Sequence, residues 1–396
     1  MKSEQSIFIR IFVFVVGNQT HKCFCVLFMN NAGYNVKYSI IAYLYSIILI
    51  IMQHSIQYQS LVLNTRIYLG DYLHAMQMLS NREIVLITDE HLKAYYPALI
   101  SKFKHIVIPP GEDSKSMDML NHVLNQLFDM KASRDTVIVG FGGGVVTDLA
   151  AFVAGIFKRG IDFILMPTSL LGMADAAIGG KCGINYYGAK NQLGLIKQPL
   201  FTFIDTKFLR TLPYLHFING LAELVKSSLI FPGNSWELIE NQREAIMKIE
   251  SDQLQILLQE AVQNKIRLVE LDVSDVGKRQ LLNFGHSFGH AVEANEKILH
   301  GLAVSKGMIA ALKMSVAAGY LKQKRAIAIV KQFEALGLPV NFTFKAEYFI
   351  YLEQDKKRSG DSMNFVFLRN PGDAFIEKIT ISQLKALAYD ARNISF

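Results

Sequence analysis

The sequence predicts an α/β fold followed by a mainly helical part, and three observations support this. Short Val- and Ile-rich runs that end in Gly, Pro or Asp, as buried strands do, recur between residues 58 and 206. They read YQSLVL, TRIYLG, EIVLITDE, HIVIPPG, TVIVGFGGG, DFILMPTS and LFTFIDT. Helical patterns such as SKSMDMLNHVLNQLFDMK separate several of them, which indicates a parallel sheet with right-handed crossovers. From about Pro213 onward the apolar positions follow the helical period, as in WELIENQREAIMKIE.

The length and the change of pattern predict two domains. The chain has 396 residues, more than one hydrophobic core usually serves. We expect a Rossmann-like α/β domain at residues 52–212 and a helical domain at residues 213–396. Residues 1–51 do not share these patterns, and we expect them to be an extension outside the fold. A membrane anchor is the alternative, but each apolar run there is shorter than the roughly 20 residues that span a bilayer.

The composition favours a small anionic ligand over nucleic acid. The formal net charge is +7 and the pI is near 9.0, yet no run of five or more Lys or Arg occurs. Three cysteines are too few for a disulfide framework. We therefore expect a cytoplasmic protein that contacts neither nucleic acid nor a membrane.

A glycine-rich turn is the candidate for a nucleotide site. Gly142, Gly143 and Gly144 follow a predicted strand over Val137–Gly140, and a helix opens with VVTD. Glycines allow a close approach to a pyrophosphate, whose charge the helix N-terminus would meet. The spacing differs from G-x-G-x-x-G, so nucleotide binding and a plain strand-to-helix turn both stay open. Asp89, at the end of another predicted strand, could reach a ribose hydroxyl or cap a helix.

Residues 167–191 form a second glycine-rich segment, PTSLLGMADAAIGGKCGINYYGAKN. Its lysines and amide side chains suit phosphate and carboxylate groups. A stretch this long without predicted regular structure is usually functional in a compact domain, so we expect a binding loop. An ordinary surface loop is the alternative. The polar candidates are Asp175, Lys181, Asn185, Lys190 and Asn191.

Three residues from separate helical segments suit a catalytic metal. Glu223 lies in NGLAELVK, His286 in LLNFGHSFGHAVEA and His300 in LHGLAVSKGM. One carboxylate and two imidazoles fit a divalent cation that keeps a position open for substrate. His290 shares a helix face with His286, so it could bind the metal or handle protons. The spacing also allows a structural histidine pair, and a surface ion pair between Glu223 and Lys226.

From about Met52 to the C-terminus, the chain resembles the 3-dehydroquinate synthase family of sugar-phosphate cyclases. The resemblance rests on GGGVVTD, RGIDFILMPTSLL, DAAIGGKCGIN, a following KN, GLAELVK, LLNFGHSFGHAVE and a late DKK, all in family order. It implies an NAD-binding α/β domain, a helical metal-binding domain, an active site between them and a homodimer.

The resemblance also implies the roles of the site residues. The metal ligands would be Glu223, His286 and His300, holding Zn2+ or Co2+. The NAD contacts would be Asp89, Glu112, Lys115, Gly143, Gly144, Asp148, Thr168, Ser169, Lys181 and Lys190. The catalytic groups would be His290, Lys181, Lys226, Lys265, Arg279 and Asn283. The contacts to substrate phosphate and carboxylate would be Asp175, Lys190, Asn191, Lys356 and, from a neighbouring subunit, Arg159.

The implied reaction converts 3-deoxy-arabino-heptulosonate 7-phosphate to 3-dehydroquinate and phosphate in the shikimate pathway. NAD would oxidise a substrate hydroxyl beside the metal, phosphate would leave by β-elimination, the hydride would return, and an aldol step would close the ring. The alternatives are another NAD- and metal-dependent sugar-phosphate cyclase, a glycerol- or polyol-phosphate dehydrogenase, and a non-catalytic binding protein with the same fold.

The chain departs from the family pattern at two informative positions. Leu302 replaces a glutamate of the family's HGEAV motif, which affects how the metal ligands are oriented and not the ligands themselves. Val273 follows Asp272 where the family usually has another acid.

Overall fold

The structure is a computed structural model that describes residues 9–12, 25–28, 55–60, 65–272, 275, 277–356 and 362–396. Contacts divide the chain into two units, Met1–His54 and Ser55–Phe396. In the first unit, β1 (Ile9–Phe12) and β2 (Cys25–Phe28) form an antiparallel pair. The expected extension over residues 1–51 falls within this unit, and its apolar run at residues 39–52 lies outside the described residues.

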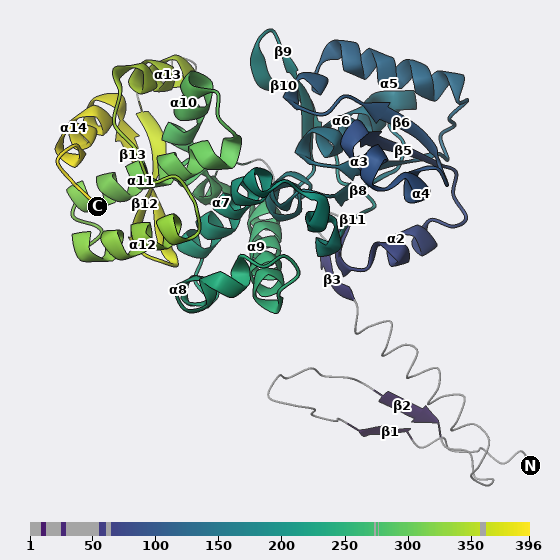
Figure 1. Cartoon of the computed structure of the whole chain (residues 1–396), viewed down its shortest axis with the longest axis horizontal. Coiled ribbons are helices and arrows are strands. Elements are labelled where there is room, and N and C mark those ends of the chain that lie inside the picture. The colour runs from purple at the N-terminus through teal and green to yellow at the C-terminus, as the bar shows by residue number, and fades with distance from the viewer. Residues whose placement is uncertain are drawn as a thin grey trace, which may run out of the picture. The chain divides into compact units, whose positions relative to one another are not determined.

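A seven-stranded sheet forms the α/β part of the second unit, in the order β3-β4-β11-β8-β7-β5-β6 (Figure 1). Its strands are β3 (Ser55–Ser60), β4 (Thr65–Gly70), β5 (Ile84–Asp89), β6 (Lys104–Ile108), β7 (Val137–Gly142), β8 (Phe163–Pro167) and β11 (Phe201–Ile204). Neighbouring strands are parallel, except that β3 runs antiparallel to β4. The predicted parallel sheet is confirmed, with one antiparallel edge strand added.

Helices cover both faces of this sheet. Along β5, Val85 and Ile87 enter one apolar cluster and Leu86 enters another, as the two-residue period of a strand requires. The first cluster includes α5 (Met117–Asp129) and α6 (Gly144–Ile156). The second face is covered by α2 (Tyr72–Met78), α3 (Glu90–Tyr95) and α4 (Pro97–Ile100). Burial on both faces explains why these strands read as continuous apolar runs.

The glycine-rich segment after β8 is regular structure, not the long loop expected from the sequence. A π-helical turn, η3 (Gly172–Ala176), leads into an antiparallel hairpin of β9 (Lys181–Tyr186) and β10 (Ala189–Ile196). Tyr187 and Gly188 connect the strands with φ angles of 51° and 78°, as a two-residue hairpin turn requires. The strands are not obvious from the sequence because glycines and polar residues interrupt the few apolar ones, Cys182, Ile184, Leu193 and Leu195, that pack against the sheet's helices.

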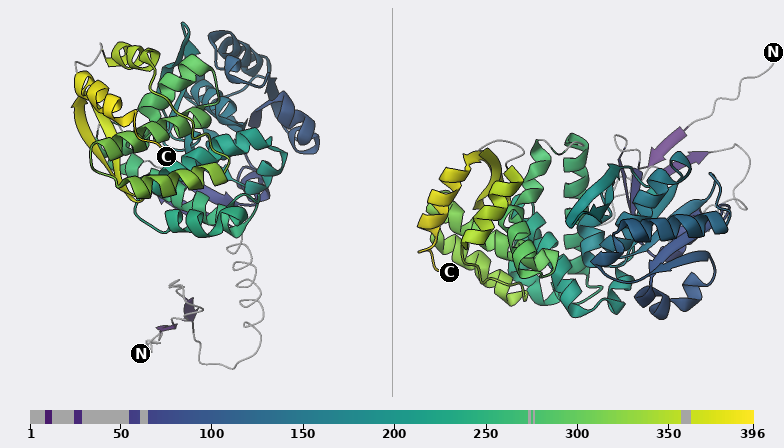
Figure 2. Two further views of the ribbon diagram at one scale, coloured as in Figure 1. Left: turned by 60° about the vertical axis from the view of Figure 1, so that its left-hand side comes forward. Right: turned by 90° about the horizontal axis from the view of Figure 1, so that it is seen from above.

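The remainder of the second unit is mainly helical, as predicted. It contains α7 (Tyr214–Ile230), α8 (Ser235–Ile246), α9 (Asp252–Leu271), α10 (His286–Glu296), α11 (His300–Ala317), α12 (Gln323–Ala335), α13 (Ala346–Lys356) and α14 (Ile381–Ala391). A hairpin of β12 (Ser362–Asn370) and β13 (Asp373–Thr380) was not expected; it packs against α7 and α11. Figure 2 shows the green and yellow helices of this part from two further sides, and α11 contacts α7, α10, α12 and α14.

Local capping fixes several helix starts. The side chains of Ser116, Ser251 and Thr380 accept hydrogen bonds from backbone N–H groups in the first turns of α5, α9 and α14. The expected boundary between residues 212 and 213 falls just before α7, but Ser55–Phe396 forms one compact unit by its contacts. The division into two domains at that point therefore stays a prediction.

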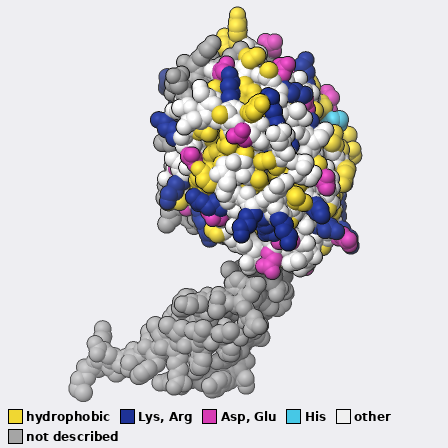
Figure 3. Space-filling model, turned by 90° about the vertical axis from the view of Figure 1, so that its left-hand side faces the viewer, with side chains coloured by type: hydrophobic (Ala, Val, Ile, Leu, Met, Phe, Trp, Pro, Cys, Tyr) yellow, Lys and Arg dark blue, Asp and Glu magenta, His cyan; other side chains and the backbone are white. Residues whose placement is uncertain are grey.

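The face formed by the C-terminal helices carries Lys and Arg side chains among acidic and apolar ones (Figure 3). Within the described residues, each helix is too short or too polar to be a candidate membrane span.

Candidate active site

The carboxyl ends of the parallel strands bring the expected cofactor residues to one edge of the sheet. β7 ends at Gly142, Gly143 is the N-cap of α6, and the helix begins at Gly144. The register pairs Ile87 of β5 with Gly140 of β7, so the end of β5 lies beside this turn. The site therefore has an open backbone turn, a helix N-terminus and a neighbouring acid, which is the arrangement that suits a pyrophosphate and a ribose.

The neighbouring acid is Asp89, and its side chain also caps a helix. Its Oδ1 accepts a hydrogen bond from Leu92 N at 3.0 Å, which leaves Oδ2 for another partner. On the other side of the turn, Thr168 N donates to Gly142 O at 2.9 Å and Ser169 Oγ lies near Gly143. Both readings of Asp89 are thus compatible with the geometry.

A buried lysine organises the polar side of this edge. Lys115 Nζ donates to Asp148 Oδ2 at 2.6 Å and to Asn191 Oδ1 at 2.5 Å. Burial raises the pKa of Asp148, against the opposing influence of Lys115. Glu112 lies 4.0 Å from the same ammonium and accepts from Asn185 Nδ2 at 2.9 Å. The structure therefore brings Glu112, Lys115 and Asp148 together, as expected.

The predicted metal ligands also converge. Glu223 Oε1 lies 3.7 Å from His286 Nε2 and 3.7 Å from His300 Nε2. This buried oxygen has no hydrogen-bond partner within the described part of the chain. The other carboxylate oxygen is paired with Lys226 in the same helix, and both side chains are buried. The surface ion pair considered from the sequence is therefore wrong, because the pair sits in the interior of the protein.

Outer partners orient both imidazoles toward Glu223. His286 Nδ1 lies 3.3 Å from Phe284 O, and His300 Nδ1 lies 3.0 Å from Glu293 Oε2. A ring N–H held by an oxygen at Nδ1 leaves the Nε2 lone pair free for a metal. Two imidazole lone pairs and an unpartnered buried carboxylate oxygen facing one another fit a divalent cation.

The two imidazoles differ in protonation tendency. Burial, and then the Lys226 ammonium, hold the pKa of His286 well below its usual range, so this imidazole is neutral. Burial also lowers the pKa of His300, but the hydrogen bond with Glu293 and the charge of Glu223 raise it overall. Metal ligation needs the unprotonated ring, so metal binding at this cluster should release a proton.

Close helix packing positions the ligands. A Cβ at Gly301 would lie 1.9 Å from Asn219 O, and Gly301 N donates to Asn219 Oδ1 at 2.7 Å. Asn219 is one helical turn before Glu223 in α7, so this contact sets His300 beside Glu223. A Cβ at Gly307 would lie 1.9 Å from Gly285 O, which joins α11 to the start of α10 in the same way.

A second group of possible ligands shares His300. His290, Glu293 and His300 also have donor atoms within 4.8 Å of one another. Both oxygens of Glu293 are already engaged, one by His300 and one by Lys190 Nζ at 2.5 Å. The group around Glu223 is therefore the better metal site, and His290, exposed with its ring 5.3 Å from that of His286, is left beside it.

Glu223, His286 and His300 are called the metal cluster, and Asp175 interacts electrostatically with His300 of this cluster and with two buried lysines, Lys265 and Lys226. Buried Lys265 donates from Nζ to Asp175 Oδ1 and to Asp175 O, both at 2.5 Å. Burial lowers the pKa of Lys265, while Asp175 opposes that shift. Burial likewise raises the pKa of Asp175, but the ammonium groups of Lys265 and Lys226 outweigh it and lower the pKa. Arg279 is buried, and a Cβ added at Gly179 would lie 2.9 Å from its guanidinium.

Two further lysines are exposed and paired with acids. Lys181 Nζ donates to Asp275 Oδ2 at 2.5 Å, and Lys190 reaches Glu293 across to α10. The glycine-rich segment thus sends one lysine to each of two separate carboxylates. An anionic ligand would compete with these carboxylates for the ammonium groups.

One expected residue, Arg159, lies away from the cluster. Arg159 comes just before the amino end of β8, at the edge of the sheet opposite the glycine turn. Asn283 is exposed and ends the short helix η5 (Lys278–Asn283) that precedes His286. Lys356 is the last residue of α13, and its side chain lies outside the described part of the structure.

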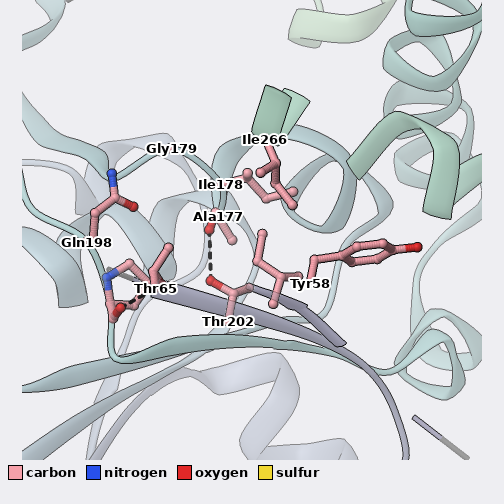
Figure 4. Close-up of a pocket in the computed structure, with 10 residues that line it drawn as sticks. Tyr58, Thr65, Ala177, Ile178, Gly179, Gln198, Thr202 and Ile266 are labelled. Atoms are coloured by element: carbon pink, nitrogen blue, oxygen red, sulfur yellow. Dashed lines mark hydrogen bonds between the residues drawn. The ribbon is translucent and has the colours of Figure 1, made fainter. Parts of the chain in front are cut away.

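A small cavity beneath Gly179 is not the substrate site (Figure 4). Its volume is about 10 Å³, enough for one water molecule at most. Thr202 Oγ1 closes one side by donating to Ala177 O at 3.0 Å, and the buried Gln198 Oε1 has no partner in the described residues.

Sequence reasoning missed three residues with clear roles in this geometry: Glu293, Asp275 and Asn219. Glu293 supplies an orienting carboxylate for His300, a role that the motif pattern led us to seek at position 302. Leu302 itself is partly buried against apolar neighbours. The spacing of seven residues between Glu293 and His300, across a helix break, was the one available signal. Asp275 and Asn219 gave none, because their partners are 94 and 82 residues away in the chain.

Two family profiles match adjacent parts of this chain. The profile "3-dehydroquinate synthase N-terminal" matches residues 105–219, and "3-dehydroquinate synthase C-terminal" matches residues 220–358. The 3-dehydroquinate synthase of Clostridium tetani is 36% identical over 300 residues, which are 74% of this chain and 80% of that protein. That of Thermoanaerobacter pseudethanolicus is 37% identical over 278 residues, 69% of this chain and 78% of that protein.

Solved structures share the fold. The 2-epi-5-epi-valiolone synthase of Streptomyces hygroscopicus, with NAD+ and Zn2+ bound, has a TM-score of 0.75 at 25% identity and covers 82% of this chain and 96% of its own. A 2-deoxy-scyllo-inosose synthase with carbaglucose-6-phosphate, NAD+ and Co2+ has a TM-score of 0.75 at 22% identity, covering 86% of this chain and 100% of its own. An iron-containing alcohol dehydrogenase is more distant, with a TM-score of 0.54.

The α/β and helical architecture and the match of both family profiles confirm the resemblance found in the sequence. This chain belongs to the 3-dehydroquinate synthase family.

Proposed function

We propose that this chain converts 3-deoxy-arabino-heptulosonate 7-phosphate to 3-dehydroquinate and inorganic phosphate. The observation that carries the proposal is the buried Glu223 Oε1, which has no partner among the described residues and faces His286 and His300. This group suits a Lewis-acidic cation, and the edge of the sheet suits a dinucleotide. The reaction needs both a metal ion and NAD. Family membership supports the same substrate.

Both cofactors fit the residues present. Glu223, His286 and His300 would hold a zinc or cobalt ion, and the turn at Gly143 and Gly144 would receive NAD. The metal, when bound, would polarise substrate hydroxyls, and NAD would accept one hydride and give it back. The NAD+ and Zn2+ of the valiolone synthase support this assignment.

The buried cations would bind the charged ends of the substrate. Lys226, Lys265 and Arg279 are all buried, and Lys226 is paired with Glu223. A phosphate or carboxylate that reaches such buried cations interacts with them more strongly than in water. Lys181 and Lys190 would exchange their present carboxylate partners for substrate oxygens. His290, exposed beside the ligands, would carry a proton between substrate and solvent.

We also propose that the enzyme works as a homodimer in which Arg159 enters the partner's site. Arg159 cannot reach the metal cluster of its own subunit, because it lies at the opposite edge of the sheet. Lys158 and Arg159 have φ angles of 49° and 70°, a backbone strain that non-glycine residues adopt mainly where function requires it. Large apolar side chains are exposed nearby, at Phe128, Ile156 and Ile196.

Mixing two inactive variants would test the shared site. A dimer of Arg159→Ala with His286→Ala contains one site that has intact metal ligands and an arginine from the partner. Co-expression should therefore restore part of the activity that each variant lacks alone. No restoration, in heterodimers isolated with two different affinity tags, would contradict the dimer proposal.

Residues 55–396 should be sufficient for this activity, and residues 1–51 dispensable. Their separation into different units by contacts supports this. A cytoplasmic location fits the buried free thiol of Cys182. Activity and intact mass of a chain that begins at Met52, compared with the full chain, would test the first point. Loss of turnover on truncation would contradict it.

Phosphate release is the decisive assay for the function. The metal-loaded protein should release phosphate from the heptulosonate phosphate only when NAD is present, and a chelator should stop the reaction. NADH should not accumulate, because the hydride is returned within each turnover. Accumulation of NADH without phosphate release would instead indicate a dehydrogenase.

A further inference from the structure

Asn185 stands at the junction between the cofactor edge and the substrate side of the proposed site. It lies in β9, opposite a bulge of β10 where the strand register shifts between Ala189 and Leu193. Within this bulge Asn191 has a φ of 53°, in the left-handed region. The bulge leaves the N–H of Asn191 without the usual strand partner.

Both ends of the Asn185 amide are engaged. Its Oδ1 accepts a hydrogen bond from Asn191 N at 2.9 Å, and its Nδ2 donates to Glu112 Oε1 at 2.9 Å. A backbone N–H can only donate and a carboxylate can only accept, so these two partners determine the orientation of the amide. The backbone is tied down as well, because Asn185 N donates to Lys115 O at 2.7 Å.

These contacts close a ring that joins the two sides of the site. Lys115 binds Asn191 Oδ1 at 2.5 Å, while Asn185 binds the Asn191 N–H. Asn191 is therefore held at both its backbone and its side chain. Glu112 and Lys115 belong to the turn that would contact NAD, and Lys190 and Asn191 belong to the bulge that would contact substrate.

We infer that Asn185 is a positioning residue that couples NAD binding to substrate binding. The inference rests on the proposed function, since it takes NAD and the heptulosonate phosphate as the ligands. NAD bound against Glu112 and Lys115 restricts the motion of that turn. Through the hydrogen bonds of Asn185, the bulge that carries Lys190 is then restricted as well. Substrate then binds to a bulge that is already ordered, so NAD raises the affinity for substrate. By linkage, substrate raises the affinity for NAD by the same factor.

Two substitutions distinguish the two hydrogen bonds of the Asn185 amide, the one from Asn191 N and the one to Glu112. Asn185→Ala removes both hydrogen bonds. Asn185→Asp keeps an acceptor for the Asn191 N–H but replaces the donor to Glu112 with a negative oxygen. The second variant therefore breaks only the arm toward the cofactor turn, and adding Glu112→Gln to it restores a donor–acceptor pair in the opposite direction.

The test uses a phosphonate analogue of the substrate, which cannot lose phosphate. Calorimetry on the metal-loaded full chain measures the affinity of this analogue with and without saturating NAD. In the wild type, NAD should strengthen analogue binding by about tenfold, within the usual range of coupling between sites. Asn185→Ala should reduce that factor to about one, and should weaken the analogue alone as well. Asn185→Asp should lose the coupling but keep the wild-type affinity for the analogue alone. Adding Glu112→Gln to Asn185→Asp should restore part of the coupling.

The control is Asn121→Ala, the same substitution on the exposed face of α5. It should leave the coupling factor unchanged. A coupling factor that stays at the wild-type value in Asn185→Ala and Asn185→Asp, or that is already one in the wild type, would overturn the inference. Failure of the proposed function gives a different result, which is absence of phosphate release by the wild type with NAD and metal.

Discussion

The two halves of the site are built in different ways. At the sheet edge, the backbone forms the binding surface: Gly143 and Gly144 leave room, and a Cβ at either would meet only ordinary contacts at 3.5 to 3.9 Å. At the metal cluster, side chains from α7, α10 and α11 form the site, and backbone glycines such as Gly301 are filled tightly against neighbours. A glycine in the first region keeps space for a ligand, whereas a glycine in the second keeps space for the protein itself.

This difference predicts how an added side chain affects ligand binding and folding in each region. A side chain added at the sheet edge should block a ligand without disturbing the fold, since the space is open. A side chain added at the helix crossing should disturb the fold and the metal together, because the helices must move apart. The predictions below separate these outcomes, beginning with the largest effect.

Removing a metal ligand should have the largest effect. His286→Ala should lose bound metal and reduce phosphate release by at least about a thousandfold, because electrostatic stabilisation by the metal is lost. Metal analysis and the phosphate assay would measure both. His122→Ala, an exposed histidine of α5, is the matched control. Wild-type metal content and rate in His286→Ala would refute the ligand assignment.

The glycine comparison can be made directly with one methyl group at each position. Gly301→Ala places a Cβ 1.9 Å from Asn219 O, so unfolding free energy should fall by about 2–4 kcal/mol and metal affinity should fall with it. Gly143→Ala should keep the wild-type melting temperature and weaken NAD binding by about tenfold, since the pyrophosphate cannot approach as closely. Denaturation and NAD titration of both variants check this, and equal melting temperatures would break the comparison.

Glu293 tests how far the metal cluster depends on its outer partners. Glu293→Ala removes the carboxylate that orients His300 and binds Lys190, so metal affinity should fall about 10- to 100-fold. Glu293→Gln keeps an oxygen that can accept from the ring and should retain more affinity. Zinc titration against a competing chelator would measure both. Equal loss in the two variants would show that charge, and not ring orientation, is the decisive factor.

The smallest expected effect concerns a pH-dependent contact of Glu296, at the end of α10 opposite His286. Hydrogen bonds from Lys306 and Tyr348 lower the pKa of Glu296 to about 2, from an ordinary value near 4.5. A lowered pKa means that the stabilisation is present above pH 4.5 and is lost as the pH falls toward 2. Glu296→Gln should therefore reduce stability by about 1 kcal/mol near neutral pH and by nothing at pH 2. A pH-independent difference in denaturation midpoints would contradict this.

Local patterns determined much of this protein. Runs of Val and Ile bounded by Gly, Pro or Asp predicted the strands that bring Asp89 and Gly143 to the sheet edge, because strand formation and turn chemistry depend on a few neighbouring residues. The residue types at Glu223, His286 and His300 likewise indicated metal chemistry before any geometry was known.

Only the tertiary structure decided which of these residues meet. It left Glu223 Oε1 without a partner among the described residues, gave the orienting role to Glu293, and put Arg159 at the far edge of the sheet. It also made a hairpin of the segment that resembled a loop, with Asn185 bridging its bulge to the cofactor turn. The physical reason is that these contacts join residues far apart in the chain, through helix crossings whose closeness no short sequence pattern encodes.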